Sequence, residues 1–228
     1  MKLNRIKMTA ILLAAIACAS LALSGCTPRL IGEAKAKEAG LAFINKVFDV
    51  NETEAVVHYC EDKIDPQSQD QSTGQEHDAP VMRFYDVDVM KDHTDGVLYY
   101  ALVDATSGFV YCAQRFAETL TPLTDERIKQ AEELVKLPYG QREVMNRLYE
   151  LKLPQTINDW MSARFEKQSK IRTVEYGKMI EGLIDSNLVS MDCRVTFENG
   201  AVYVIGIILP TKQIYQIQIL SQPVVRGS

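Results

Sequence analysis

The stretch SMDCRVTFENGAVYVIGIILPTKQIYQIQIL, residues 190–220, decides the fold class of this chain. It contains three runs rich in β-branched and aromatic residues, separated by two turn signals. Asn199-Gly200 is a strong short-range signal for a β-hairpin, and Pro210-Thr211-Lys212 marks the next turn. In the last run apolar and polar side chains alternate, Tyr215, Ile217 and Ile219 against Gln216 and Gln218. We therefore predict an antiparallel meander with one face exposed to solvent.

A second meander is expected in the first half of the chain. The run VLYYALVDATSGFVYCAQR, residues 97–115, predicts two strands around a turn with Asp104 at its entry and Gly108 at its exit. A tight turn of this kind needs a positive φ at the glycine. Residues 81–92 alternate as a further strand, and residues 51–60 begin polar and become a short strand. The polar stretch 61–80 predicts a long exposed loop.

Amphipathic helices precede both meanders. Residues 32–48 place apolar side chains at helical spacing. After a break at residues 121–124, one helix is expected to begin with Thr124 as N-cap and to end near Pro138. A second is expected over 139–151, and a third is expected to be capped by Thr156. The pattern after residue 172 is ambiguous, and we favour a strand. Helices followed by antiparallel β-meanders predict the α+β class.

The first half resembles a PepSY-type module, a small extracytoplasmic domain of bacterial envelope proteins. The resemblance rests on the Ala-rich helix start, residues 33–36, and on YYALVDATSGFV, residues 99–110. There an aromatic strand is followed by Asp, Gly and a hydrophobic strand. The resemblance implies a PepSY-like α+β domain over 32–118 that regulates, inhibits or binds partner proteins. Residues 119–228, a helical segment plus antiparallel sheet, are expected to form a second α+β domain, and the shared order of elements predicts two small cystatin/PepSY-like units. The resemblance brings no catalytic residue.

The N-terminal segment has the layout of a bacterial lipoprotein signal. Three cations precede an apolar run, 8–23, that is shorter than the roughly 20 residues a membrane span needs. Leu23-Ser24-Gly25-Cys26 resembles the lipobox, in which the Cys thiol receives a diacylglycerol and the peptidase cuts just before it. The resemblance implies that residues 1–25 are removed, that Cys26 is the lipid attachment residue, and that 26–31 is a tether. An ordinary signal peptide containing a Cys is the alternative.

Composition limits the partners of the chain. Its 30 Asp and Glu outnumber its 25 Lys and Arg, giving a formal net charge of −5. Because the cations Lys2, Arg5 and Lys7 lie in the segment expected to be removed, the mature chain is more acidic still. An acidic domain is a poor candidate for binding nucleic acid, or for binding anionic lipid through a cluster of basic residues. We expect the diacylglycerol on Cys26 to hold the chain at the extracytoplasmic face of a membrane.

The remaining cysteines are expected to be structural. Cys60, Cys112 and Cys193 are odd in number, so at least one is unpaired within the chain. Cys60 and Cys112 both fall in expected strands and are a candidate disulfide pair. The favoured interpretation is that all three are small buried apolar residues.

The search for chemistry gives no catalytic motif, and we expect neither enzymatic activity nor a cofactor or metal. His58 and Cys60 share a strand face and are a conceivable metal or thiolate pair, and Asp86 and Asp88 share another as a paired-carboxylate candidate. For both pairs ordinary strand side chains are the favoured interpretation, and Asp104 is expected to shape its turn. An acidic loop exposed to solvent is favoured over a calcium site for Asp65, Asp70, Glu76 and Asp78. Trp160 is expected to lie in the core.

These features predict a lipid-anchored, non-enzymatic protein of the cell envelope that binds or regulates a partner protein. A sheet edge would be the natural contact surface. The alternative is an envelope lipoprotein that binds a small ligand or a cation. An envelope hydrolase is disfavoured, because no cluster of titratable groups can be read from the sequence.

Overall fold

The computed structural model describes residues 29–63, 81–92, 96–137, 142–165, 170–181 and 188–221. The chain divides into two units, Met1–Leu30 and Ile31–Ser228, and the second contains every helix and strand discussed below. The signal segment 1–25 and the lipid attachment residue Cys26 lie outside the described residues. So do the loop acids Asp65, Asp70, Glu76 and Asp78.

Eight antiparallel strands form one sheet in the order β1-β2-β3-β4-β8-β7-β6-β5. This arrangement confirms the α+β class and the two meanders, including the strand favoured after residue 172. The first meander comprises β1 (Val56–Lys63), β2 (Val81–Met90), β3 (Val97–Asp104) and β4 (Val110–Arg115). The second comprises β5 (Ile171–Glu181), β6 (Val189–Phe197), β7 (Val202–Leu209) and β8 (Gln213–Ser221).

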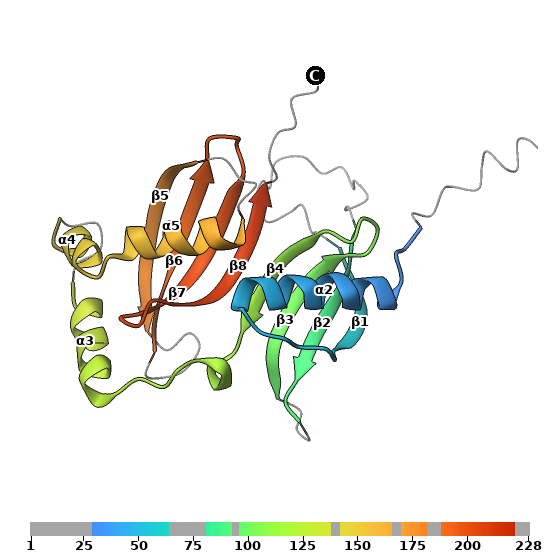
Figure 1. Cartoon of the computed structure of the whole chain (residues 1–228), viewed down its shortest axis with the longest axis horizontal. Helices are drawn as coiled ribbons and strands as arrows, with labels where there is room; N and C mark the ends of the chain where they lie inside the picture. The colour runs from blue at the N-terminus through green and yellow to red at the C-terminus, as the bar shows by residue number, and fades with distance from the viewer. Residues whose placement is uncertain are drawn as a thin grey trace, which may run out of the picture. The chain divides into compact units, whose positions relative to one another are not determined.

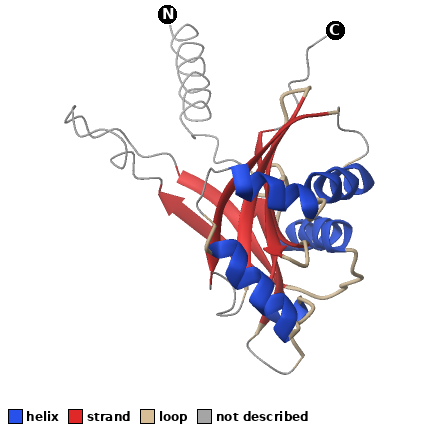
Figure 2. Cartoon of the chain, turned by 90° about the vertical axis from the view of Figure 1, so that its left-hand side faces the viewer, coloured by secondary structure: helices blue, strands red, loops and turns tan. Residues whose placement is uncertain are grey.

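The helices gather on one face of the sheet and beside one of its ends. α2 (Glu33–Phe48) and α5 (Leu153–Arg164) lie across the same face (Figures 1 and 2). α3 (Asp125–Val135) and α4 (Arg142–Glu150) lie beside the β5 end of the sheet, and a short 3₁₀ turn, η2 (Ala117–Thr119), follows β4. One contiguous core joins buried residues of both meanders, among them Ile44, Val87, Ala101, Ile157, Ile205 and Ile217.

Close contact between α2 and the sheet depends on a glycine. Gly40 faces β2, and a Cβ built at this position would lie 2.8 Å from Cβ of Val87. Real Cβ atoms are not found so close, so only glycine lets the helix backbone approach the strand at this distance. The helix at residues 32–48 was expected from its apolar spacing, whereas this approach was not.

The two halves repeat the same order of elements and meet at their last strands. α2 precedes β1–β4, and α5 precedes β5–β8. β4 pairs with β8 through Ala113 opposite Ile217 and one further pair on each side. Above this junction the Arg164 Nε donates a hydrogen bond of 2.6 Å to the carbonyl oxygen of Val47. The two expected meanders thus share one sheet, through a pairing that no local signal predicts.

Turn and cap signals are largely confirmed. Gly108 and Gly200 have φ of 76° and 85°, as their hairpins require. The Thr124 side chain accepts a hydrogen bond from the backbone N–H of Arg127, so it caps α3. Thr156 is not a cap, however. α5 already begins at Leu153, and the Thr156 hydroxyl donates to the carbonyl oxygen of Lys152. Pro154 at the first turn explains the earlier start.

Three further expectations are corrected. β1 continues to Lys63, so the first residues of the expected loop 61–80 belong to a strand. Trp160 is only partly buried, against the core. Tyr215 does not share a face with Ile217, because Ile207 pairs with Ile214 and Gly206 with Gln216. Tyr215 is therefore the extra residue of a β-bulge.

The bulge sends the Tyr215 ring to the face of the sheet opposite the main core. The ring packs over Gly206, where a Cβ would lie 2.5 Å from Cζ of Tyr215. Its hydroxyl donates to Asp192 Oδ1 over 3.3 Å. A small second cluster covers the ring, comprising Leu120, Leu188 and Ile208.

Candidate functional site

The sequence candidates converge on the face of the first meander that points away from α2, which we call the open face. Val87 is fully buried beneath α2, so Asp86 and Asp88 face the other way. The strand register places His58 opposite Asp86, and Asp88 opposite Tyr100. The pairs His58–Cys60 and Asp86–Asp88, which the sequence analysis treated separately, therefore belong to one cluster.

Hydrogen bonds organise this cluster around Asp86. The Tyr100 hydroxyl donates to Asp86 Oδ1 over 2.8 Å, and the Cys60 thiol donates to Asp86 Oδ2 over 3.3 Å. Both donors lie on strands next to β2. Each oxygen of the Asp86 carboxylate thus accepts one hydrogen bond, which fixes this side chain on the sheet face.

The environment shifts the pKa values of its neighbours upwards. Burial, and then the hydrogen bond to Asp86, raise the pKa of Tyr100 far above its ordinary value. The same two causes raise the pKa of Cys60. Burial, followed by the charge of Asp86, raises the pKa of Asp88, while His58 acts in the opposite direction. A raised pKa disfavours the thiolate form of Cys60, which is the nucleophilic form of a cysteine.

The cluster does not assemble a metal centre from the described residues. Within the ranges that the structure covers, no group of three or more His, Cys, Asp or Glu side chains could hold a metal ion. The pair Asp86 and Asp88 does share a face, as the sequence predicted. The cluster forms a polar, acidic surface on the open face of the sheet.

Cys60, Cys112 and Cys193, the cysteines in the described ranges, are free thiols. Cys60 lies on β1 and Cys112 on β4, with two strands between them. At about 4.8 Å per strand their backbones are roughly 14 Å apart, too far for a disulfide. The candidate pair is therefore wrong. Cys193 is fully buried, whereas the other two are only partly buried, and burial raises the pKa of Cys112 to about 11.

Asp104 shapes its turn, as expected. Its Oδ1 accepts hydrogen bonds from the backbone N–H and the hydroxyl of both Thr106 and Ser107, at 2.7–3.0 Å. Its Oδ2 accepts from the Tyr111 hydroxyl at 2.9 Å. Although partial burial opposes the shift, these donors hold the pKa of Asp104 well below its usual range. Both oxygens of the carboxylate therefore already accept hydrogen bonds. Asp104 also lines a small cavity of about 190 Å³.

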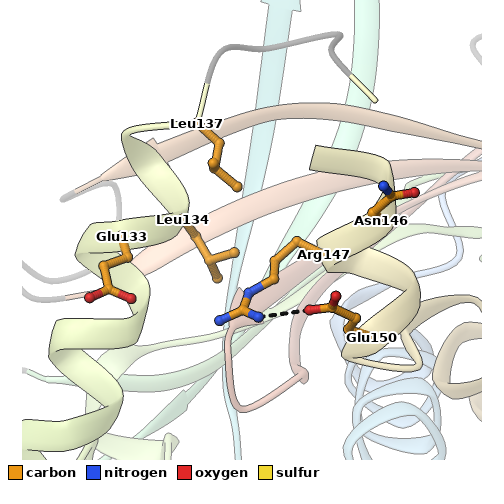
Figure 3. Close-up of a pocket in the computed structure, with 6 residues that line it drawn as sticks. All are labelled: Glu133, Leu134, Leu137, Asn146, Arg147 and Glu150. Carbon is orange, nitrogen blue, oxygen red and sulfur yellow. Dashed lines mark hydrogen bonds and ion pairs between the residues drawn. The ribbon is translucent and has the colours of Figure 1, made fainter. Parts of the chain in front are cut away.

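A larger hollow of about 380 Å³ lies between α3 and α4 (Figure 3). α3 contributes Glu133 and Leu134, and Leu137 follows its C-terminal end. On the α4 side Arg147 Nη1 pairs with Glu150 Oε2 at 2.7 Å, so the guanidinium group that lines the hollow already has an acidic partner. None of the sequence candidates lines this hollow, and it lies away from the open face.

The outer edge of the sheet at β1 is the other notable surface. β1 pairs with β2 along its whole length, and no described residue pairs with its other side. Val56 and Tyr59 are 44% and 39% exposed on this strand. The Tyr59 hydroxyl and Arg83 Nε both donate to Glu61 Oε1, so a charged group stands among the apolar ones.

Sequence reasoning missed Tyr100 as a member of the cluster. The strand 97–104 was expected, but its register against β2 was not, and only the register brings the Tyr100 hydroxyl to Asp86. Its position two residues before Leu102, on the face opposite the buried Ala101, is the local signal that could have placed it on the open face.

None of the described helices combines the length and the apolar character needed to cross a bilayer. Comparison with protein-family models, with curated proteins and with solved structures gives no match to this chain. Its function must therefore be argued from its own residues.

Proposed function

We propose that this chain is a lipid-anchored protein of the cell envelope that acts by binding a partner protein, without enzymatic activity of its own. The diacylglycerol on Cys26 would hold it at the extracytoplasmic face of a membrane, and the lipobox-like residues 23–26 support this anchor. The single observation that supports partner binding is the outer edge of β1. A regulatory or inhibitory role, as in PepSY-type modules, fits the same surface.

A strand edge is a docking template because its backbone groups remain free to pair. All eight residues of β1 are in register with β2, which fixes the strand and leaves its second side for an added strand. The other edge strand, β5, lies beside α3 and α4 (Figure 1), and α3 contacts it. α2 likewise contacts β1.

The side chains of β1 favour a specific partner over self-association. Val56 and Tyr59 supply apolar contact area, whereas Glu61 and Asp62 place charges near one end of the strand. Charges on an edge strand oppose indiscriminate pairing between copies. A partner strand with apolar residues opposite Val56 and Tyr59 and a cation opposite Glu61 would match this edge.

Replacement of Val56 and Tyr59 by Lys tests the edge. The V56K/Y59K variant should lose a partner that the parent retains after chemical cross-linking in the intact envelope, because two added cations block strand addition. Tyr149 on α4 is 61% exposed, so Y149K is the matched control and should retain the partner. Recovery of the same partner with V56K/Y59K and with the parent would contradict the proposal.

The anchor is tested separately by Cys26→Ser. This variant should be released from the membrane fraction or remain unprocessed, because Ser offers no thiol for the diacylglycerol. Fractionation and mass spectrometry of the N-terminus measure the outcome. A C26S form that matured and sedimented with membranes like the parent would disprove the anchor.

A second candidate function is the binding of a small cationic ligand at the open face. The observation in its favour is Asp88, a carboxyl group that is partly buried beside the charge of Asp86. A bound cation would offset the burial and the repulsion by Asp86 that together raise the pKa of Asp88. Asp88→Asn should abolish any saturable thermal stabilisation by polyamines or divalent metal ions, and the absence of such stabilisation in the parent would eliminate this candidate.

A further inference from the structure

The open face of the first meander continues onto the second meander across the β4–β8 junction. Ala113 and Ile217 pair at this junction, and both are fully buried in the core on the helix side. Their neighbours along each strand therefore point to the opposite side, where Cys112 faces Gln218. The two halves thus form one surface of eight strands, which we call the eight-strand surface, on the side away from α2 and α5 (Figure 2).

One row of side chains crosses the eight-strand surface from edge to edge. Outward from Cys112 the strand register gives Leu102, Asp86 and then His58. Outward from Gln218 it gives Val204, Arg194 and then Glu175. The two directions match in chemistry: each begins with a partly exposed aliphatic residue, continues with a charged residue, and ends with an exposed ionisable one.

The charges at equal distances from the junction are opposite in sign. Asp86 lies on β2, two strands from β4, and Arg194 lies on β6, two strands from β8. Arg194 is exposed and forms no ion pair with any described residue. Asp86 accepts hydrogen bonds from Tyr100 and Cys60, but no described cation pairs with it. Each half therefore presents the charge that the other half lacks.

We propose that two copies of this chain pair face to face through the eight-strand surface, about a two-fold axis that runs parallel to the strands at the β4–β8 junction. Such an axis lays β2 of one copy over β6 of the other, because these strands are equally far from the junction. Asp86 of one copy then meets Arg194 of the second, and the symmetry repeats this ion pair. Facing sheets pack about 10 Å apart, a gap that two opposed side chains fill.

The rest of the row fits the same arrangement. Leu102 of one copy lies over Val204 of the other, which buries apolar area on both sides. His58 lies over Glu175, so a protonated imidazole gains a carboxylate partner. Pairing through this surface leaves the outer side of β1 open to a partner strand, and it would cover Asp88 against a small cation.

The charges select this axis over the other two-fold stack of the same surfaces. An axis perpendicular to the strands would lay β2 over β2, and so place Asp86 and Asp88 against the same two acids of the second copy. Along the strands, the axis that we propose leaves one unfavourable contact, Asp88 over Asp192. Burial and then Asp86 already raise the pKa of Asp88, so this carboxyl group takes up a proton more readily than an ordinary one.

The size of the surface suits a stable pair. Eight strands at about 4.8 Å and about seven residues at roughly 3.3 Å cover about 38 by 23 Å, or roughly 900 Å². Each partner in a standard interface contributes about 800 Å². The cluster around Tyr215 rises from the same surface over Ile208, which lies further along β7 than Val204. The row from His58 to Glu175 passes beside this cluster.

Capture of one tagged copy by another tests the pairing. Full-length chains with two different C-terminal tags are produced together and extracted in detergent, and the second tag is measured after capture of the first. Arg194→Glu in both copies should lower the captured fraction about tenfold or more, because an acid then meets Asp86 at both symmetric positions. Asp86→Lys in both copies should do the same. One D86K copy with one R194E copy should restore parental capture, because the exchanged charges attract again.

Arg127→Glu is the matched control, because Arg127 is an exposed cation on α3, outside the eight-strand surface. It should be captured like the parent. Val204→Glu should reduce capture without any change at Asp86, so the result does not depend on the folding of D86K. Failure of parental copies to capture one another, or equal capture of R194E and the parent, would overturn the proposal. So would failure of the mixed pair when circular dichroism shows that both variants are folded.

Discussion

At the scale of single residues, Asp104 shows how one carboxylate can define a turn. It accepts five hydrogen bonds from three residues that follow it, so the loop closes on its side chain rather than on buried apolar area. The sequence predicted this role, because an Asp at the entry of a short loop and a Gly at its exit are local signals. The fifth bond, from Tyr111, was not predictable, since it requires the register of β4.

Asp104→Asn should destabilise the chain by about 1–3 kcal/mol at pH 7. The amide has no charge, and its single oxygen cannot accept both the hydrogen bond from Tyr111 and those from the turn. The pKa of Asp104 is lowered in the folded state. Its contribution is therefore fully present at neutral pH and declines as the pH falls below the unfolded value of about 4. Urea unfolding of both forms at pH 7 and at pH 3 measures the change. A stability difference that grew towards pH 3 would contradict this assignment.

At the scale of elements, local patterns predicted most strands and helices, whereas contacts between elements escaped prediction. The alternation of residues 81–90 correctly gave the buried face of β2, and Asn199-Gly200 gave the β6–β7 hairpin. Thr156 was misplaced as a cap because its hydroxyl instead bonds back within α5. The bulge at Tyr215 reversed the face expected for its ring, since one extra residue shifts the alternation.

The approach of α2 to β2 gives a prediction at this scale. Gly40→Ala should destabilise the chain by about 1–3 kcal/mol, because the added Cβ meets Val87. Val87→Ala alone also destabilises, by leaving a cavity. In the double variant the two costs should be less than additive, because the smaller strand residue makes room for the added methyl group. Full additivity in a urea-unfolding cycle would show that Gly40 has another role.

At the scale of the whole described unit, the junction of β4 and β8 joins two similar halves into one core. No turn or motif marks this pairing, because its strands are far apart in the sequence. The candidate cluster on the open face depends on long-range pairing in the same way. His58–Cys60 and Asp86–Asp88 were visible as separate pairs, and only the register of β1, β2 and β3 united them and added Tyr100.

A contiguous core predicts a single unfolding transition. Trp160 is the only Trp, so its fluorescence reports on α5 and the second half. Far-UV circular dichroism reports on both halves. The two probes should give coincident urea transitions, because the same cluster of buried residues spans both meanders. Separate midpoints would show that residues 32–118 and 119–228 unfold as independent domains.

The place of β8 in the sheet has a consequence for the order in which the chain acquires its structure. The last strand to be synthesised fills a central position, between β4 and β7. β4 therefore waits for roughly 100 further residues before its neighbour exists, and loop closure over such a distance is slow. During synthesis the first meander exposes two edges instead of one. A chain that stopped before residue 213 would keep the edge at Ala113 open and present it to any strand nearby.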